Sequence, residues 1–289
     1  MTPSPGRHSS SARTAMRSGP AAWPTARRCE VREAPLVAFT LAGQAAAGAY
    51  AIVAGLQLMA GAPVGLVDLR TLAVLLLLMV VGMAASLFHL GAPQRAYRAL
   101  LGLRTSWLSR EVLAAALFAG CLGVQAGAAW LWGARHIPAG LALLTALAGL
   151  ALIYCMARAY MLRTMQAWDT PAVLLSFVAT SLVLGSLLAL VLGPGVGPRG
   201  GALLWLLALA AAADAALGLW RLRPARPGKY GSLRAPARPH AALAALHVGL
   251  LFLGISWAWW ALVAARSFLP ALALVVAAEV AGRAQFYRV

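Results

Sequence analysis

Two short stretches at the two ends of one loop decide the fold. Residues 86–96 read SLFHLGAPQRA, and residues 106–111 read SWLSRE. The first stretch closes the apolar run 72–90 with His89, and a glycine and a proline then interrupt the helix, because proline cannot continue the hydrogen-bond ladder. The second stretch opens the next apolar run with Glu111. An imidazole and a carboxyl group are therefore expected at the same end of two neighbouring helices.

This pair suits proton exchange with a weakly acidic amphiphile, such as a quinol, at the edge of a bilayer. The ordinary pKa of histidine, near ~6.5, lets His89 accept a proton close to neutral pH. Glu111 can orient the imidazole or take a second proton. Arg95, Arg98 and Arg110 form a basic rim whose positive potential favours an anionic quinol.

Each member of the pair also has a purely structural interpretation. His89 can be a helix-end histidine at the level of the lipid headgroups. Glu111 follows Ser109, which is expected to cap the helix, and a first-turn acid complements the helix dipole by ~0.3–1 kcal/mol. The presence of both groups at one membrane face favours the functional interpretation.

The composition predicts an integral membrane protein. The chain has 289 residues, of which 62% are hydrophobic and 11% charged, and a soluble domain cannot cover that much apolar surface. A spanning helix needs ~20 apolar residues, and the sequence offers eight such runs without the alternation of a membrane barrel. They are approximately 36–60, 71–90, 111–133, 138–157, 171–192, 201–220, 241–265 and 267–283.

We therefore predict an all-α bundle of eight transmembrane helices over residues 35–289. Residues 1–34 are rich in Ser, Pro, Arg and Ala, and they are expected to be a disordered arm or a mis-assigned start.

The formal net charge of +17 is explained by membrane topology rather than by nucleic acid. Twenty of the 24 Lys and Arg residues fall in the two termini and in alternate loops, including the loop between His89 and Glu111. By the positive-inside rule, this side of the membrane is cytoplasmic. A basic docking face for an acidic partner would produce the same excess of charge.

Several polar side chains within or near the ends of apolar runs are candidate interior groups. They are Gln44, Arg158, Tyr160, Asp214, Glu279 and Arg283. A charge in a membrane span costs at least ~2.5–3.5 kcal/mol, so these groups should face the bundle interior. Glu279 lies four residues before Arg283, which predicts a same-helix ion pair. Asp214 is expected to pair with an arginine of the following loop, and Gln44 to hydrogen-bond a neighbouring helix.

No metal site is predicted in this chain. Cys29, Cys121 and Cys155 lack the spacing and number needed for an iron–sulfur cluster or structural zinc. A b-type haem needs two axial ligands at matched depth, and His89 and His247 do not match well. A haem-bearing anchor therefore stays an alternative rather than the leading interpretation.

The sequence resembles the family of membrane anchor subunits of dimethyl sulfoxide reductase. The resemblance is carried by FHLGAPQRA at 88–96 and LSRE at 108–111, together with PLVAFTLAGQ at 35–44 and AEVAGRAQFY at 278–287. It extends from about residue 33 to 287. The departures are local, namely the arginine at position 110 before the acid and a sequence that stops at Val289.

The resemblance implies an eight-helix anchor for a molybdopterin catalytic subunit and a four-cluster iron–sulfur subunit in the bacterial inner membrane. It also implies menaquinol oxidation during anaerobic respiration, without haem, iron–sulfur cluster or molybdopterin in this chain. The quinol-linked histidine and acid of the family fall on His89 and Glu111. Anchors of this family are described with their termini outside, in conflict with the charge count. A small secondary transporter, with Glu279 and Asp214 as coupling groups, is the alternative from another functional class.

Overall fold

A computed structural model describes most of the chain. The described residues are 26–59, 67–88, 101–134, 137–161, 170–193, 200–222 and 238–287. The protein divides into two units, Met1–Glu33 and Ala34–Val289, and the bundle discussed below belongs to the second unit.

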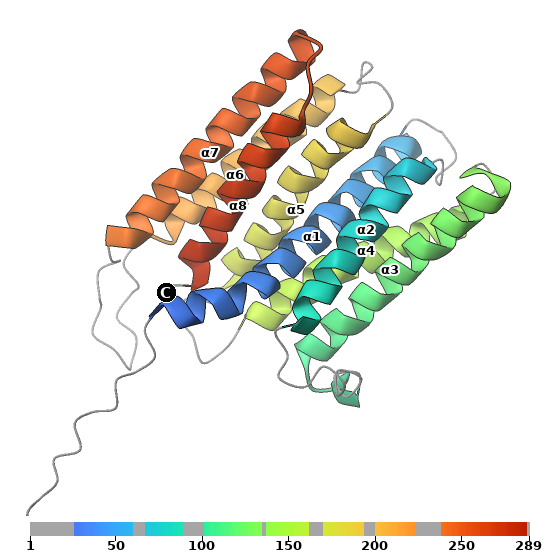
Figure 1. Ribbon diagram of the computed structural model, residues 1–289, viewed down its shortest axis with the longest axis horizontal. Helices are drawn as coiled ribbons and strands as arrows, with labels where there is room; N and C mark the ends of the chain where they lie inside the picture. Colours follow the sequence, from blue (N-terminus) through green and yellow to red (C-terminus); the bar gives the residue numbers. More distant parts are fainter. Residues whose placement is uncertain are drawn as a thin grey trace, which may run out of the picture. The chain divides into compact units, whose positions relative to one another are not determined.

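The described ranges contain eight α-helices and no strand, which confirms the predicted all-α fold (Figure 1). The helices are α1 (Ala26–Met59), α2 (Leu69–Phe88), α3 (Trp107–Trp132), α4 (Ala139–Tyr160), α5 (Pro171–Leu192), α6 (Gly200–Trp220), α7 (Arg238–Val263) and α8 (Leu269–Tyr287). Seven of them are long and apolar enough to cross a membrane. The eighth, α8, is the shortest and contains Glu279 and Arg283. Apolar leucines, valines and tryptophans cover the outside, as lipid requires. The protein is a multi-pass membrane protein.

Helix α1 begins nine residues before the expected start of the membrane domain, and Pro35 lies inside it. Its apolar span covers Ala34–Gln57. Residues 1–25, most of the predicted disordered arm, lie outside the described part of the chain.

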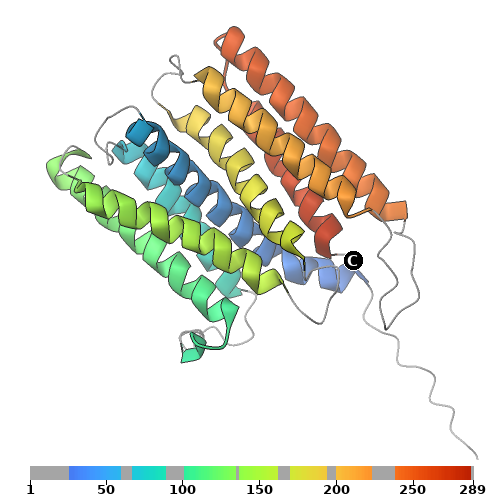
Figure 2. The same cartoon turned by 180° about the vertical axis from the view of Figure 1, so that it is seen from behind.

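Two hydrophobic cores divide the bundle into halves. Helices α1–α4 lie beside α5–α8 in both the front and the back view (Figures 1 and 2). The first core is built mainly from α1–α4, and the second mainly from α5–α8. Helices α1 and α5 contribute side chains to both cores, so they join the halves. Successive helices run in opposite directions. Helices α2, α4, α6 and α8 therefore all end at one face of the bundle, which we call the Glu111 end (Figure 1).

The contact between α1 and α5 depends on two glycines. A Cβ atom on Gly48 would overlap the backbone oxygen of Ser181, and one on Gly185 would lie 2.5 Å from the carbonyl carbon of Gly48. Both obstacles are backbone atoms, so they cannot rotate away. Small residues of this kind let membrane helices approach closely and gain packing energy where no hydrophobic effect drives them together.

A buried network of polar side chains ties three helices of the first half together. The Tyr50 hydroxyl of α1 donates to Gln125 Oε1 of α3 at 3.0 Å, and the Gln125 amide donates to the Thr145 hydroxyl of α4. Thr145 in turn donates to the backbone oxygen of Leu141 at 2.7 Å. In a membrane interior, such bonds satisfy polar groups that would otherwise be desolvated.

Candidate functional site

Of the predicted pair His89 and Glu111, the structure describes Glu111 alone. Helix α2 ends at Phe88 and α3 begins at Trp107, both at the Glu111 end (Figure 1). Glu111 is therefore described, whereas His89, Arg95 and Arg98 lie outside the described residues. The pairing of the imidazole with the carboxyl group stays a prediction.

The start of α3 differs from the expected one. The N-cap is Ser106 rather than Ser109, and its side chain accepts a bond from the Ser109 backbone N–H at 3.4 Å. Arg110 donates to the backbone oxygens of Leu103 and Arg104, each at 2.9 Å, and so fastens the preceding turn to the helix. Glu111 consequently lies in the second turn, where the first-turn dipole explanation for its presence no longer holds.

Glu111 is almost completely buried, with 3% of its surface exposed. Among the described residues, none donates a hydrogen bond to its carboxyl group or forms an ion pair with it. Buried carboxylates normally have such partners, because an unpaired charge in a low-dielectric interior is costly. The feature is typical of a group that holds a proton or meets a ligand.

Two arginines lie against one indole beside this carboxyl group. The guanidinium carbons of Arg110 and Arg158 lie 4.2 and 4.8 Å from the ring centroid of Trp107, at cation–π distance. Tyr160 packs against α5 within the first core instead, with its ring centroid 5.4 Å from that of Phe177. Arg158 thus lies beside the start of α3.

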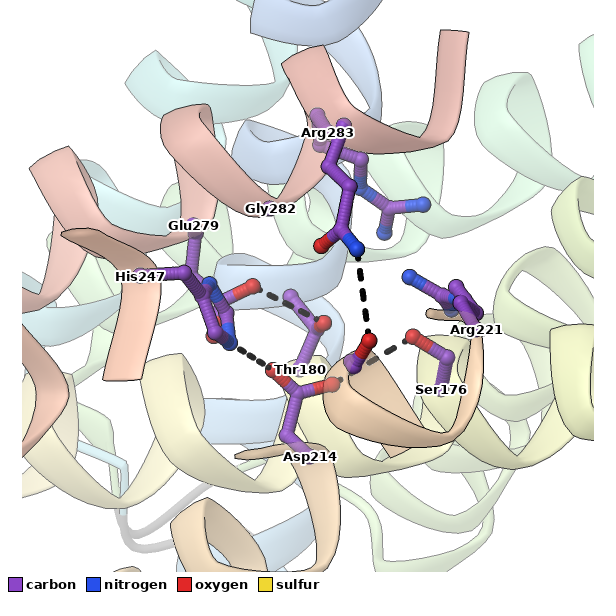
Figure 3. A pocket seen from close by; sticks show the side chains of 10 residues that line it. Ser176, Thr180, Asp214, Arg221, His247, Glu279, Gly282 and Arg283 are labelled. Carbon is purple, nitrogen blue, oxygen red and sulfur yellow. Dashed lines mark hydrogen bonds and ion pairs between the residues drawn. The ribbon is translucent and has the colours of Figure 1, made fainter. Parts of the chain in front are cut away.

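A second polar group lies inside the α5–α8 half and forms what we call the interior pocket (Figure 3). Its lining residues are Ser176, Thr180, Asp214, Gly218, Arg221, His247, Glu279, Gly282, Arg283 and Gln285. They surround a cavity of about 10 Å³, the space of roughly one water molecule. The pocket brings together Asp214, Glu279 and Arg283, three residues that the sequence marks as interior groups.

His247 and Asp214 share a proton. Nδ1 of His247 lies 2.8 Å from the backbone oxygen of Ala278, a contact that requires a proton on Nδ1 because a carbonyl only accepts. Nε2 lies 2.9 Å from Oδ2 of Asp214. If both groups were deprotonated there, two lone pairs would face each other, so either the imidazole or the carboxyl group carries a proton at this contact. Asp214 thus pairs with a histidine of α7 and not with an arginine of the following loop.

Arg221 follows α6 and lines the same pocket. Burial lowers the pKa of its guanidinium from the ordinary value, and the nearby carboxylate of Asp214 opposes this shift. Arg221 therefore adds positive charge to the pocket near Asp214.

Glu279 and Arg283 do not form the predicted same-helix ion pair. Glu279 accepts from the Thr180 hydroxyl at 3.0 Å. Arg283 donates to Gln44 Oε1 at 2.6 Å and stacks over the ring of Phe177, with 4.0 Å between guanidinium carbon and centroid. The Gln44 amide donates to the Phe177 backbone oxygen at 3.1 Å, which confirms its predicted role between helices.

Sequence reasoning missed several residues of the pocket, among them Ser176, Thr180, Gly218, Gly282 and Gln285. The hydroxyls of Ser176 and Thr180 stand four residues apart in a mostly apolar helix, a spacing that places them on one face and could have identified them. Gly282 gives no such signal. A Cβ atom there would lie 2.6 Å from Nδ1 of His247, so its role follows only from the packed structure.

The comparison with protein families decides the assignment. A profile described as DMSO reductase anchor subunit (DmsC) matches residues 29–289. The protein belongs to this family. The resemblance predicted from the short motifs is thereby confirmed over most of the sequence.

Individual relatives match this anchor subunit either over part of their length or at lower sequence identity. It is 38% identical over 128 residues to a sulfite dehydrogenase subunit of Allochromatium vinosum, covering 40% of this chain and 39% of that protein. It is 32% identical over 161 residues to one chain of the anaerobic dimethyl sulfoxide reductase of Haemophilus influenzae, covering 54% and 56%. A chain of the Escherichia coli anaerobic dimethyl sulfoxide reductase is 26% identical over 276 residues, covering 88% and 94%. The alignment thus spans about half or less of the first two relatives. No solved structure significantly matches this anchor subunit.

Proposed function

We propose that this subunit anchors a molybdopterin catalytic subunit and an iron–sulfur subunit to the bacterial inner membrane and oxidises menaquinol for them. The observation that carries the proposal is the buried carboxyl group of Glu111. It has no donor among the described residues, and it lies at the end of the bundle where α2 stops one residue before His89. Family membership supports the anchoring role.

The proposed chemistry follows from what quinol oxidation releases. A quinol loses two electrons and two protons to become a quinone. His89 accepts one proton near neutral pH, and Glu111 accepts the other or holds the imidazole in place. The electrons need metal centres, and three cysteines without cluster spacing cannot supply them. They therefore pass to the iron–sulfur partner.

The two other interpretations of the sequence are less well supported. Family membership favours an anchor over a secondary transporter. A haem at His247 would need a free ring nitrogen, but Nδ1 faces the Ala278 carbonyl and Nε2 faces Asp214. Both nitrogens are thus engaged within the protein.

A second candidate function is the reverse reaction. The relative from Allochromatium vinosum is a sulfite dehydrogenase subunit, and a dehydrogenase delivers electrons instead of consuming them. In that case, the same imidazole and carboxyl group would protonate a quinone during its reduction.

The affinity-tagged full-length protein, purified with its partners, distinguishes these functions. We expect an iron–sulfur protein and a molybdopterin protein to co-purify, and a menaquinol analogue to drive reduction of an S- or N-oxide. Quinone reduction driven by sulfite, without reduction of any oxide, would reverse the proposed direction. Purification of the anchor without either partner would contradict the anchoring role.

A further inference from the structure

Glu279 is buried inside the membrane domain with half of its carboxyl group unused. The residue is 2% exposed, and its Oε2 accepts from Thr180 at 3.0 Å. Its Oε1 has no hydrogen-bond partner among the described residues, although it is buried. Because an unsatisfied buried acceptor is costly, a carboxylate kept only for stability normally has both oxygens bonded. Figure 3 shows this side chain among the residues that line the interior pocket.

The nearest cation along α8 forms no ion pair with Glu279. Arg283, one turn further along α8, donates to Gln44 and stacks on Phe177 instead of forming an ion pair with Glu279. The other charged or titratable groups facing the pocket are Asp214 on α6, Arg221 directly after α6, and His247 on α7. From α5, only hydroxyl groups face it. Glu279 thus has polar neighbours, while its Oε1 accepts no hydrogen bond among the described residues.

The neighbouring contact is a buried carboxyl–imidazole pair. The geometry of Nδ1 and Nε2 requires that His247 or Asp214 carries a proton between them, across 2.9 Å. The Ser176 hydroxyl donates to the other oxygen of Asp214 at 3.3 Å. The pocket therefore contains a carboxyl–imidazole pair, a second carboxyl group and room for about one water molecule.

The pocket is within reach of one membrane face. Glu279 lies eight residues before the end of α8, which is about 12 Å at the rise of an α-helix. Gln285 and Arg221, which also line the pocket, lie at or just beyond the ends of α8 and α6. These polar side chains extend the lining toward the Glu111 end.

We propose that the interior pocket is a proton-exchange site that binds water, with Glu279 as the exchanging group and the His247–Asp214 pair as its neighbour. A proton reaches Oε1 of Glu279 through the bound water, which takes up a proton from the His247–Asp214 pair as it gives one up. The proton returns by the same route, so no electron transfer and no co-reactant are needed. The site is separate from the Glu111 carboxyl group, which belongs to α3. Interior carboxyl–histidine arrays of membrane proteins commonly serve as proton relays.

Infrared spectroscopy of the full-length protein in lipid nanodiscs tests this proposal. We expect a C=O stretching band of a protonated carboxylic acid that changes with pH, shifts after exchange into D₂O, and is lost in Glu279→Gln. Ser186→Ala is the matched control, since Ser186 is buried on α5 without lining the pocket. That variant should keep the band unchanged.

Thr180→Val provides a second test that leaves the acid in place. Removal of the hydroxyl that donates to Oε2 should move the C=O band to higher frequency, because the carboxyl group loses a hydrogen bond. The proposal is wrong if no band depends on pH, if the band does not shift in D₂O, or if Thr180→Val leaves it in place. Survival of the band in Glu279→Gln would equally overturn the assignment.

Discussion

At the scale of single residues, the interior pocket contains a buried carboxyl–imidazole pair whose loss should be costly. His247 and Asp214 are 3% and 4% exposed, and their contact joins α7 to α6. Loss of one partner from a buried pair leaves the other uncompensated, which typically costs about 3–5 kcal/mol. Loss of a weaker neutral hydrogen bond costs about 1 kcal/mol.

A double-mutant cycle on this pair should therefore be strongly non-additive. We expect Asp214→Asn and His247→Gln each to lower the apparent melting temperature of the purified protein in detergent. The double variant should lose little more than the worse single variant, because contacting residues share one interaction energy. Ser176→Ala, which removes only a 3.3 Å hydroxyl bond to Asp214, is the control and should cost less. Additive losses would show that the two side chains do not act as a pair.

The sequence predicted which residues lie inside the bundle better than it predicted their partners. Asp214, Glu279 and Gln44 could be identified because polar groups in apolar runs must avoid lipid. Their partners depend on which helices pack together. The spacing within α8 suggested an ion pair between Glu279 and Arg283. In the packed bundle, Glu279 instead accepts a hydrogen bond from Thr180 of α5, and Arg283 donates to Gln44 of α1.

At the scale of helices, the α1–α5 contact holds the two halves together. Gly48→Ala would place a methyl group on the Ser181 backbone oxygen and force the helices apart. Overpacking of this kind costs about 1–3 kcal/mol. Gly55→Ala, in the same helix, has no atom within 4 Å of the new methyl group. It should be neutral or slightly stabilising, since alanine favours helices by up to about 1 kcal/mol over glycine.

Thermal unfolding of the two variants in the same detergent measures the difference. Gly48→Ala should unfold at a clearly lower temperature than Gly55→Ala. Equal temperatures would mean that the close approach of α1 and α5 contributes nothing to stability.

Helix positions were also predictable at this scale, but one helix start was not. The apolar runs reproduce the helices because a spanning segment must be long and apolar. The start of α3 was misplaced by three residues, since Ser106 and Ser109 are equally good capping residues. Arg110 hydrogen-bonds the turn of residues 101–105 to the helix, and Ser106, which follows this turn directly, is therefore the N-cap.

At the scale of the whole molecule, both polar sites lie toward the same end of the bundle. Glu111 lies near the start of α3, and the interior pocket extends toward the ends of α6 and α8. Among the basic residues that the structure describes, Arg104, Arg110, Arg158 and Arg221 lie at or beside helix ends of this face. A quinol site there would be close to a basic face, which the positive-inside rule assigns to the cytoplasm.

The central claim is that His89 and Glu111 accept the protons of a quinol as it is oxidised. It is tested most directly by two turnover rates measured on the same membranes. One rate uses a menaquinol analogue as donor, and the other uses a reduced dye that delivers electrons to the partner subunits directly. His89→Ala should lower the quinol-dependent rate by about 10²–10⁴-fold, the usual contribution of a general base, and leave the dye-dependent rate intact. Glu111→Gln should show a milder form of the same defect. His240→Ala, a histidine of α7 outside the interior pocket, is the matched control. If His89→Ala keeps the two rates in their original ratio, the histidine is structural and the proposed quinol site is wrong.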